Sequence, residues 1–231
     1  GGCPDDCRPG PLGDLWWGGY EDALFEKEVL KVVEHHDPAE PLFLFWAPHV
    51  AHGPLQAPQA ITDDFDFMSS TDKPTHERQH YAAMVHFADM AIGNVTSALK
   101  VKGMWDDLLL VFMADNGGWI SKAGIAGGNN FPLKGGKYNN WEGGIRSNSF
   151  VSGGFLPSSR RGTKYEGLVT GWDWYATFAA LAGVDATDHR AAAAGLPPID
   201  SIDLSAVLLG TNIKSPRDEV PIGSGPRESN L

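Results

Sequence analysis

A run of apolar residues at 108–113, preceded at once by a long helical pattern, constrains the fold more than any other feature of this sequence. The run is too short for a helix and stops at Asp115-Asn116-Gly117-Gly118, so it predicts a buried strand that ends in a turn. Residues 77–100 carry apolar side chains at helical spacing, and Gly103 follows them. A helix leading into a buried strand is typical of α/β folds, whose ligands lie at the carboxyl ends of strands.

The remaining elements are predicted from shorter patterns. Residues 21–36 and 173–182 are expected to be helices, and residues 42–46 and 149–152 to be strands, the first of them buried. Residues 190–198 are expected to form a surface insertion.

The end of the central strand offers groups that suit a metal and an anion. Asp115 and Asn116 supply two hard oxygen ligands for a divalent cation, although the same residues also make a good turn. Nine glycines follow between Gly117 and Gly144, and such a backbone can approach a ligand closely. Lys134 and Lys137 lie in this segment and suit an oxyanion such as sulfate or phosphate.

The formal net charge of −11 over 231 residues argues against a nucleic-acid or anionic-membrane partner. Any anion site must therefore be locally basic, which singles out the cluster Lys122, Lys134, Lys137 and Arg146. No apolar run approaches the roughly 18 residues of a membrane span, and no signal peptide is visible. Nothing in the sequence indicates an oligomeric state.

Two features bear on compartment. Cys3 and Cys7 form either a local disulfide or two unpaired thiols, and their spacing leaves both readings open. Asn94-Val95-Thr96 fits the glycosylation sequon, which matters only if the chain enters the secretory pathway.

Four ordered blocks closely resemble the corresponding blocks of sulfatases, most of all the arylsulfatase B-like group. They are Pro41 to Pro58, Phe112 to Gly118, Pro132-Leu133-Lys134-Gly135-Gly136-Lys137, and Trp141-Glu142-Gly143-Gly144-Ile145-Arg146. The resemblance covers residues 20–209 and leaves 1–19 as a loop-rich start and 210–231 as a tail. It implies an α/β fold of the alkaline phosphatase superfamily, with a mainly parallel sheet flanked by helices on both faces, present here in incomplete form.

The resemblance also implies roles for individual residues. Asp115 and Asn116 match family ligands of calcium, sometimes magnesium, and Lys137 matches the active-site lysine. His52 matches a histidine that contacts the sulfate or protonates the leaving oxygen. Lys134 is a weaker candidate that could instead pair with a carboxylate.

The resemblance assigns supporting roles to several further residues. Trp141, Glu142, Gly143, Gly144 and Arg146 are expected to order the lysine segment through a buried aromatic, a Gly-Gly turn and an arginine available for a carboxylate. Asp173 is explained by helix capping.

The family nucleophile is not identifiable in this chain. Sulfatases convert a cysteine or serine in Cys/Ser-x-Pro-x-Arg to formylglycine, whose hydrated aldehyde attacks sulfur. Cys7-Arg8-Pro9-Gly10-Pro11 begins like this motif but ends in proline where arginine is required. The Asp-Asp pair that lies upstream of this motif in the family and completes its metal site is also not identifiable here. We therefore expect the formylglycine to lie outside this chain and the chain alone to have little or no activity.

Three functions remain open at this stage. The first is a sulfuric ester hydrolase acting on sulfated sugars or glycans, located in the secretory pathway, lysosomal or extracellular. The second is a catalytically inactive sulfate- or glycan-binding relative that lacks the nucleophile. The third is a phosphoesterase of the same superfamily. The Trp-Glu-Gly-Gly-Ile-Arg block favours the sulfatase.

Overall fold

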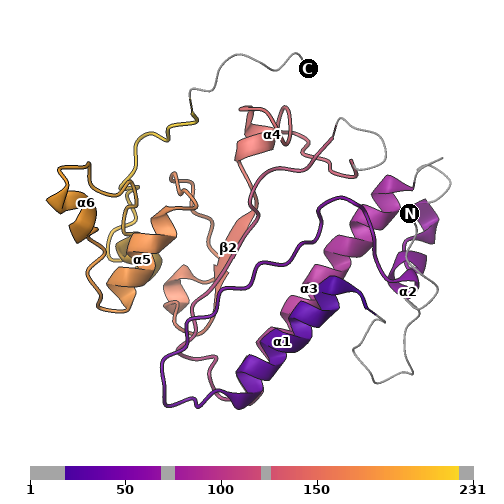
Figure 1. Cartoon of the computed structure of the whole chain (residues 1–231), viewed down its shortest axis with the longest axis horizontal. Coiled ribbons are helices and arrows are strands. Elements are labelled where there is room, and N and C mark those ends of the chain that lie inside the picture. Colours follow the sequence, from indigo (N-terminus) through magenta and orange to yellow (C-terminus); the bar gives the residue numbers. More distant parts are fainter. Residues whose placement is uncertain (1–18, 69–75, 121–125, 224–231) are drawn as a thin grey trace. The chain divides into compact units, whose positions relative to one another are not determined.

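The computed structural model describes residues 19–68, 76–120 and 126–223, and its chain divides into two compact units. The first unit comprises residues 1–108 and 116–148, and the second comprises residues 109–115 and 149–231. Figure 1 labels the elements along the chain. Cys3, Cys7 and Lys122 lie outside the described residues, so the predictions made for them have no structural counterpart.

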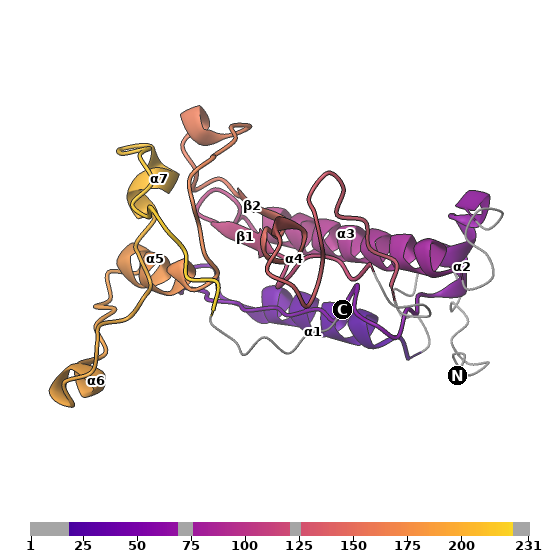
Figure 2. The ribbon, with the colours of Figure 1, turned by 90° about the horizontal axis from the view of Figure 1, so that it is seen from above.

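The first unit is organised by two helices, α1 (Glu21–His35) and α3 (Glu77–Val101), which lie side by side in both Figure 1 and Figure 2. They run in the same direction, because Ala23 packs in one cluster with Ala83 and Phe87, and Val33 packs in another with Leu99. Both helices have apolar residues at helical spacing on the shared face, which is why the sequence predicted them. This face forms the core of the unit.

Shorter elements complete the first unit. Helix α2 (Gln59–Asp63) begins directly after Pro58, and the 3-10 turn η1 (Asp66–Met68) follows it. Ile61 of α2 joins the cluster of Ala23 and Phe87. Helix α4 (Glu142–Ile145) is a single turn at the end of the glycine-rich segment. This unit holds His52, Asn116, Lys134 and Lys137.

The second unit contains one antiparallel pair of strands, β1 (Leu110–Met113) and β2 (Ser149–Ser152), in which Leu110 pairs with Ser152 and Met113 with Ser149. The 3-10 turn η2 (Ser158–Arg160) and helices α5 (Asp173–Leu181), α6 (His189–Ala193) and α7 (Ser205–Leu209) follow. Leu156, Trp174 and Leu208 form its buried core, against which Val111 and Phe178 pack.

The expectation of a mainly parallel sheet with helices on both faces is wrong for the part of the chain that the structure describes. That part contains a single two-stranded sheet, and its strands are antiparallel. The expected buried strand at residues 42–46 is also wrong: the segment is not a strand, and Phe43 and Phe45 are 73% and 82% exposed. A strand needs a neighbour for its backbone groups. Within the described residues the 42–46 segment is not paired as a strand of a sheet.

Candidate functional site

The metal-ligand candidates follow directly on β1. Asp115 is exposed and Asn116 is partly buried. Across the described residues there is no group of three or more His, Cys, Asp or Glu side chains that could hold a metal ion. Calcium takes six to eight oxygen ligands, so one carboxylate and one amide do not make a calcium site by themselves. The residues present therefore fit the ion only as a partial ligand set, and we derive no chemical step through a metal.

The glycine-rich segment after Asn116 is held in shape by the side chain of Asn130. Its Oδ1 accepts a hydrogen bond of 2.9 Å from the N–H of Gly118. Its Nδ2 donates to the carbonyl oxygens of Gly118, at 2.9 Å, and of Gly135, at 3.0 Å. One amide thus joins the backbone at Gly118 to the backbone at Gly135, next to Lys134. Sequence reasoning missed Asn130, because an asparagine among glycines also reads as ordinary turn composition.

Backbone packs directly on backbone in this loop, which explains why glycine is needed there. A Cβ atom added to Gly117 would collide with the carbonyl oxygen of Gly143, and one added to Gly144 would collide with that of Gly136. Hydrogen bonds of 2.8 Å run from the Gly117 N–H to the Gly144 carbonyl and from the Gly143 N–H to the Lys134 carbonyl. The loop is therefore a compact layer of peptide groups. We call residues 116–120 and 126–146 the lysine loop.

The lysine loop rests on helix α3. Gly127 is buried against Tyr81, whose side chain a Cβ at this position would strike. The guanidinium of Arg78 donates a hydrogen bond of 3.0 Å to the Gly127 carbonyl oxygen. Burial raises the pKa of the Tyr81 hydroxyl, and the positive charge of Arg78 offsets part of that rise. The helix thus supplies a rigid support for the loop.

Lys137 and Lys134 lie on this loop without a carboxylate partner among the described residues. Lys137 is partly buried, and its backbone N–H donates a hydrogen bond of 3.1 Å to the Gly118 carbonyl oxygen. Its side-chain Nζ lies 5.6 Å from the centre of the Tyr138 ring. The Nζ of Lys134 lies 3.8 Å above the ring of Trp141, a cation–π contact. Both ammonium groups therefore keep a positive charge that no carboxylate in the described chain neutralises.

The expectation of a buried aromatic at position 141 is wrong, because Trp141 is 54% exposed. Its ring supports the Lys134 ammonium and remains at the surface because the packing inside the loop is made by peptide groups. Gly143 and Gly144 are buried, as a structural Gly-Gly turn requires. Arg146 pairs with Glu142 at 3.6 Å, which confirms its expected carboxylate contact.

His52 is exposed, and its Nδ1 lies 2.8 Å from the carbonyl oxygen of Gly53. Within the described residues, no hydrogen bond, ion pair or ring contact connects it with the lysine loop. His49 instead contacts α1. Its ring Nδ1 lies 2.9 Å from Glu21 Oε2, and its backbone N–H donates a hydrogen bond of 2.8 Å to Asp22 Oδ1. The hydrogen bond and charge of Glu21 raise the pKa of His49. His49 thus anchors the segment that carries His52.

Asn94, the predicted glycosylation site, lies within α3 and is partly buried. Its Nδ2, the atom to which a glycan would attach, donates a hydrogen bond of 2.7 Å to Glu26, which is 3% exposed. Burial raises the pKa of the Glu26 carboxyl, and the hydrogen bond from Asn94 offsets part of the rise. Glycosylation of Asn94 stays a prediction.

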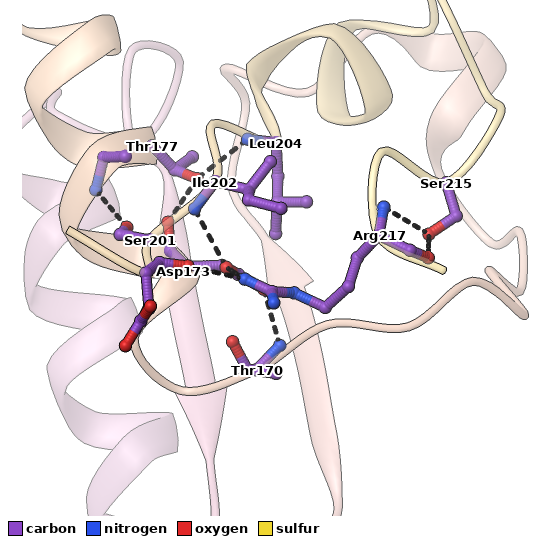
Figure 3. Close-up of polar contacts among 10 residues, drawn as sticks. Thr170, Asp173, Thr177, Ser201, Ile202, Leu204, Ser215 and Arg217 are labelled. Carbon is purple, nitrogen blue, oxygen red and sulfur yellow. Dashed lines mark hydrogen bonds and ion pairs between the residues drawn. The ribbon is translucent and has the colours of Figure 1, made fainter. Parts of the chain in front are cut away.

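The second unit contains a buried ion pair that the sequence did not reveal (Figure 3). Asp173 is fully buried, and its carboxylate accepts hydrogen bonds from both Nε and Nη2 of Arg217. It also accepts from the N–H groups of Thr170, at 2.8 Å, and Ile202, at 3.0 Å. Burial alone would raise the pKa of Asp173, but the hydrogen bonds from Arg217 and Thr170 bring it below its ordinary value.

Helix capping therefore explains Asp173 only in part. The Asp173 carboxylate accepts the backbone N–H of Thr170, whose carbonyl accepts the Asp173 N–H at 3.1 Å, a reciprocal pair at the start of α5. The same carboxylate also binds Ile202 and Arg217, which capping does not explain. Arg217 lies 44 residues further along the chain, so no local pattern joins the two.

Comparison with known proteins places these features in a family. A family model described as Sulfatase matches residues 3–184. Arylsulfatase J of Mus musculus is 38% identical over 165 residues, which are 71% of this chain and 26% of that protein. Arylsulfatase A of Homo sapiens is 30% identical over 237 residues, covering 95% of this chain and 40% of that protein. The chain thus spans a quarter to two-fifths of these relatives.

Solved structures agree with the sequence matches. The crystal structure of Ps i-CgsB in complex with k-i-k-neocarrahexaose superposes with a TM-score of 0.69 and 29% identity, over 85% of this chain and 40% of that one. The Bacteroides fragilis protein yidJ superposes with a TM-score of 0.62 over 85% of this chain and 43% of its own. At 16% identity, yidJ shows a shared fold alone.

Proposed function

The chain belongs to the sulfatase family, and on that premise we propose that the complete protein hydrolyses sulfate esters. The observation that carries the proposal is the lysine loop. Two ammonium groups without carboxylate partners in the described chain are presented by a backbone layer that cannot accept side chains. Such fixed positive charge suits a tetrahedral dianion or its monoester, because preorganised donors stabilise charge that develops during the reaction.

Each site residue has a distinct role in this proposal. Lys137 binds a sulfate oxygen and assists the departing ester oxygen, and His52 donates to a second oxygen or protonates the leaving group. Lys134, held over Trp141, adds positive potential at the rim of the site. Asp115 and Asn116 contribute two ligands to a calcium or magnesium site whose other ligands come from the rest of the complete protein. The formylglycine, when present in the complete protein, supplies the attacking oxygen.

The substrate class in this proposal is a sulfated sugar or glycan. Support comes from the relatives: N-acetylgalactosamine-6-sulfatase of Homo sapiens is 27% identical over 80% of this chain, and the crystal structure of Ps i-CgsB holds an oligosaccharide. We also propose a secretory compartment, lysosomal or extracellular, in which the sequon at Asn94 could be used. No helix in the described ranges is long and apolar enough to cross a membrane.

The test measures sulfate release by the complete protein, carrying its Cys-x-Pro-x-Arg motif, from an aryl sulfate and from a sulfated hexasaccharide. Lys137→Ala should lower kcat/KM by about 10²–10³-fold, the usual effect of removing one transition-state donor. Lys164→Ala is the matched control, because Lys164 is 78% exposed and pairs with Glu166 at 2.7 Å. It should leave kcat/KM unchanged.

The outcomes separate the alternatives. Sulfate release that is insensitive to Lys137→Ala would refute the role of the lysine loop. Release of phosphate from an aryl phosphate that is faster than release of sulfate from the aryl sulfate would identify a phosphoesterase. Binding of the sulfated hexasaccharide without turnover, in a complete protein that lacks the nucleophile, would identify a binding relative.

A further inference from the structure

The second unit has an open hollow of about 750 Å³ that shares no residue with the lysine loop. Its lining comes from Trp172 and Tyr175, from residues 187–190 at the start of α6, and from residues 199–201. The volume lies within the range typical of small-molecule sites, and the lining combines aromatic rings with a few polar groups. The hollow is open to solvent over most of its extent, so it suits a ligand that lies on one face rather than one that is enclosed.

One wall of the hollow is aromatic. Trp172 and Tyr175 are 42% and 58% exposed, although large aromatic side chains usually bury most of their area. Trp172 has helical backbone angles directly before α5, so the two residues are three apart on one helical turn. Residues at this spacing are neighbours on a helix surface. The two rings therefore present adjacent apolar area to solvent.

Another part of the lining is hydrogen-bonded to the core of the same unit, as Figure 3 shows for Ser201. Ser201 Oγ accepts a hydrogen bond of 2.8 Å from the Ala176 N–H, and the Asp200 carbonyl accepts one of 2.8 Å from Arg217 Nη2. The Arg217 guanidinium also lies 5.8 Å from the centre of the Trp172 ring. The buried ion pair thus holds both the backbone of the hollow and one of its rings. Such preorganisation lowers the entropy lost on binding.

The charges around the hollow are mixed. Arg190 and His189 are accompanied by Asp188 and Asp200, and His189 already lies 3.1 Å from Asp185. The Asp188 carboxylate accepts the N–H groups of Arg190 and Ala191 at the start of α6. This balance does not attract a sulfate group as the lysine loop does. It suits hydroxyl groups, which both donate to carboxylates and accept from a guanidinium.

We infer that the hollow beside α5 and α6 is a saccharide-binding site that stacks an uncharged pyranose ring of a glycan on Trp172 and Tyr175. A pyranose presents an apolar C–H face to the rings and hydroxyl groups to the polar rim. The choice of a glycan rests on the proposed function, whereas the stacking geometry does not. In this proposal the hollow binds a sugar unit of the glycan other than the one whose sulfate is hydrolysed. Binding of that unit positions a long glycan on the protein.

The experiment titrates the 231-residue chain by calorimetry with a neutral galactose-based hexasaccharide. Tyr175→Ala should weaken binding by at least about tenfold, because it removes one of the two rings on which the sugar stacks. Trp172→Phe keeps a ring and should weaken binding less. Phe67→Ala is the matched control, because Phe67 is an aromatic residue that is 76% exposed elsewhere in the chain. Phe67→Ala should bind the hexasaccharide like the wild type.

The site would be refuted if the neutral hexasaccharide did not bind, or if Tyr175→Ala bound it as tightly as Phe67→Ala does. It would also be refuted if only a sulfated hexasaccharide bound and Lys137→Ala abolished that binding. The proposed function fails in a different assay, the release of sulfate from a small aryl sulfate by the complete protein. The two failures can therefore be told apart.

Discussion

Removal of the Arg217 guanidinium by Arg217→Ala should destabilise the second unit strongly, because it leaves the Asp173 carboxylate buried and without its cation. Asp173 is fully buried, and the Arg217 side chain is 9% exposed. The variant loses the contacts from Nε and Nη2 to the carboxylate and from Nη2 to the Asp200 carbonyl. Breaking a buried pair from one side typically costs about 3–5 kcal/mol of folding free energy.

The structure places the expected value toward the lower end of that range. After the substitution, Asp173 keeps the hydrogen bonds from the N–H groups of Thr170 and Ile202. Two such donors continue to stabilise the carboxylate, so we expect a loss of about 3 kcal/mol. Arg146→Ala is the matched control: Arg146 also pairs with a carboxylate, but its side chain is 57% exposed. It should cost no more than about 1 kcal/mol.

The assay is urea unfolding of the chain, followed by circular dichroism and tryptophan fluorescence. A double variant, Asp173→Asn with Arg217→Met, removes both charges and should recover at least about 1 kcal/mol relative to Arg217→Ala. If Arg217→Ala lost no more stability than Arg146→Ala, the argument from burial would be refuted. A double variant less stable than Arg217→Ala would refute the argument from an uncompensated charge.

The pair also predicts a dependence on pH. Because the pKa of Asp173 lies below its ordinary value, the folded state binds fewer protons than the unfolded chain in acid. The stabilisation is fully present above the unfolded value of about 3.9 and is lost as the pH falls through the lower folded value. The difference in stability between the wild type and Arg217→Ala should therefore shrink in acid.

Four further substitutions test the first unit. Gly143→Ala should abolish sulfate release by the complete protein, because the added Cβ collides with the Gly135 carbonyl oxygen, and normal turnover would contradict the packing argument. Gly93→Ala on α3 is the control: its Cβ meets open space, so it should raise the free energy of unfolding by about 0.5–1 kcal/mol. Asn130→Ala should cost about 1–3 kcal/mol and speed hydrogen exchange of the Gly118 amide, and an unchanged exchange rate would count against it. Burial raises the pKa of Glu26 in the folded state, so wild-type stability falls as the pH rises from the unfolded pKa of about 4.3 through the folded pKa. Glu26→Gln removes the titrating group and should therefore stabilise the chain at pH 7. Urea midpoints that fall with pH in the variant as they do in the wild type would refute the argument.

Local patterns predicted local structure well. Helices expected at 21–36 and 77–100 were found as Glu21–His35 and Glu77–Val101, and the strand at 149–152 has the predicted bounds. Each of these elements depends on a pattern of apolar residues that lies within the element itself, so the sequence of that element is enough to predict it. The 42–46 segment failed because a strand also depends on a partner, and its apolar composition says nothing about whether one is present.

The candidate site was predictable to the extent that the family resemblance covered it. The resemblance to sulfatases is confirmed, and it directed attention to Lys134 and Lys137 on the lysine loop. It could not identify Asn130, whose role depends on three backbone groups brought near it by folding. It could not identify Arg217 either, because the resemblance read from the sequence ended at residue 209 and Arg217 acts across 44 residues.

Asp173 and Arg217 are 44 residues apart, so the ribosome adds the carboxylate before its cationic partner. A ribosome adds about 5–20 residues per second, so Arg217 is added about 2–9 s after Asp173. During that interval the nascent chain carries the carboxylate of Asp173 without its cation, and α5 cannot settle in its final surroundings. We therefore expect nascent chains halted between the two residues to be cleaved near α5 by added protease, and chains extended well beyond Arg217 to resist it.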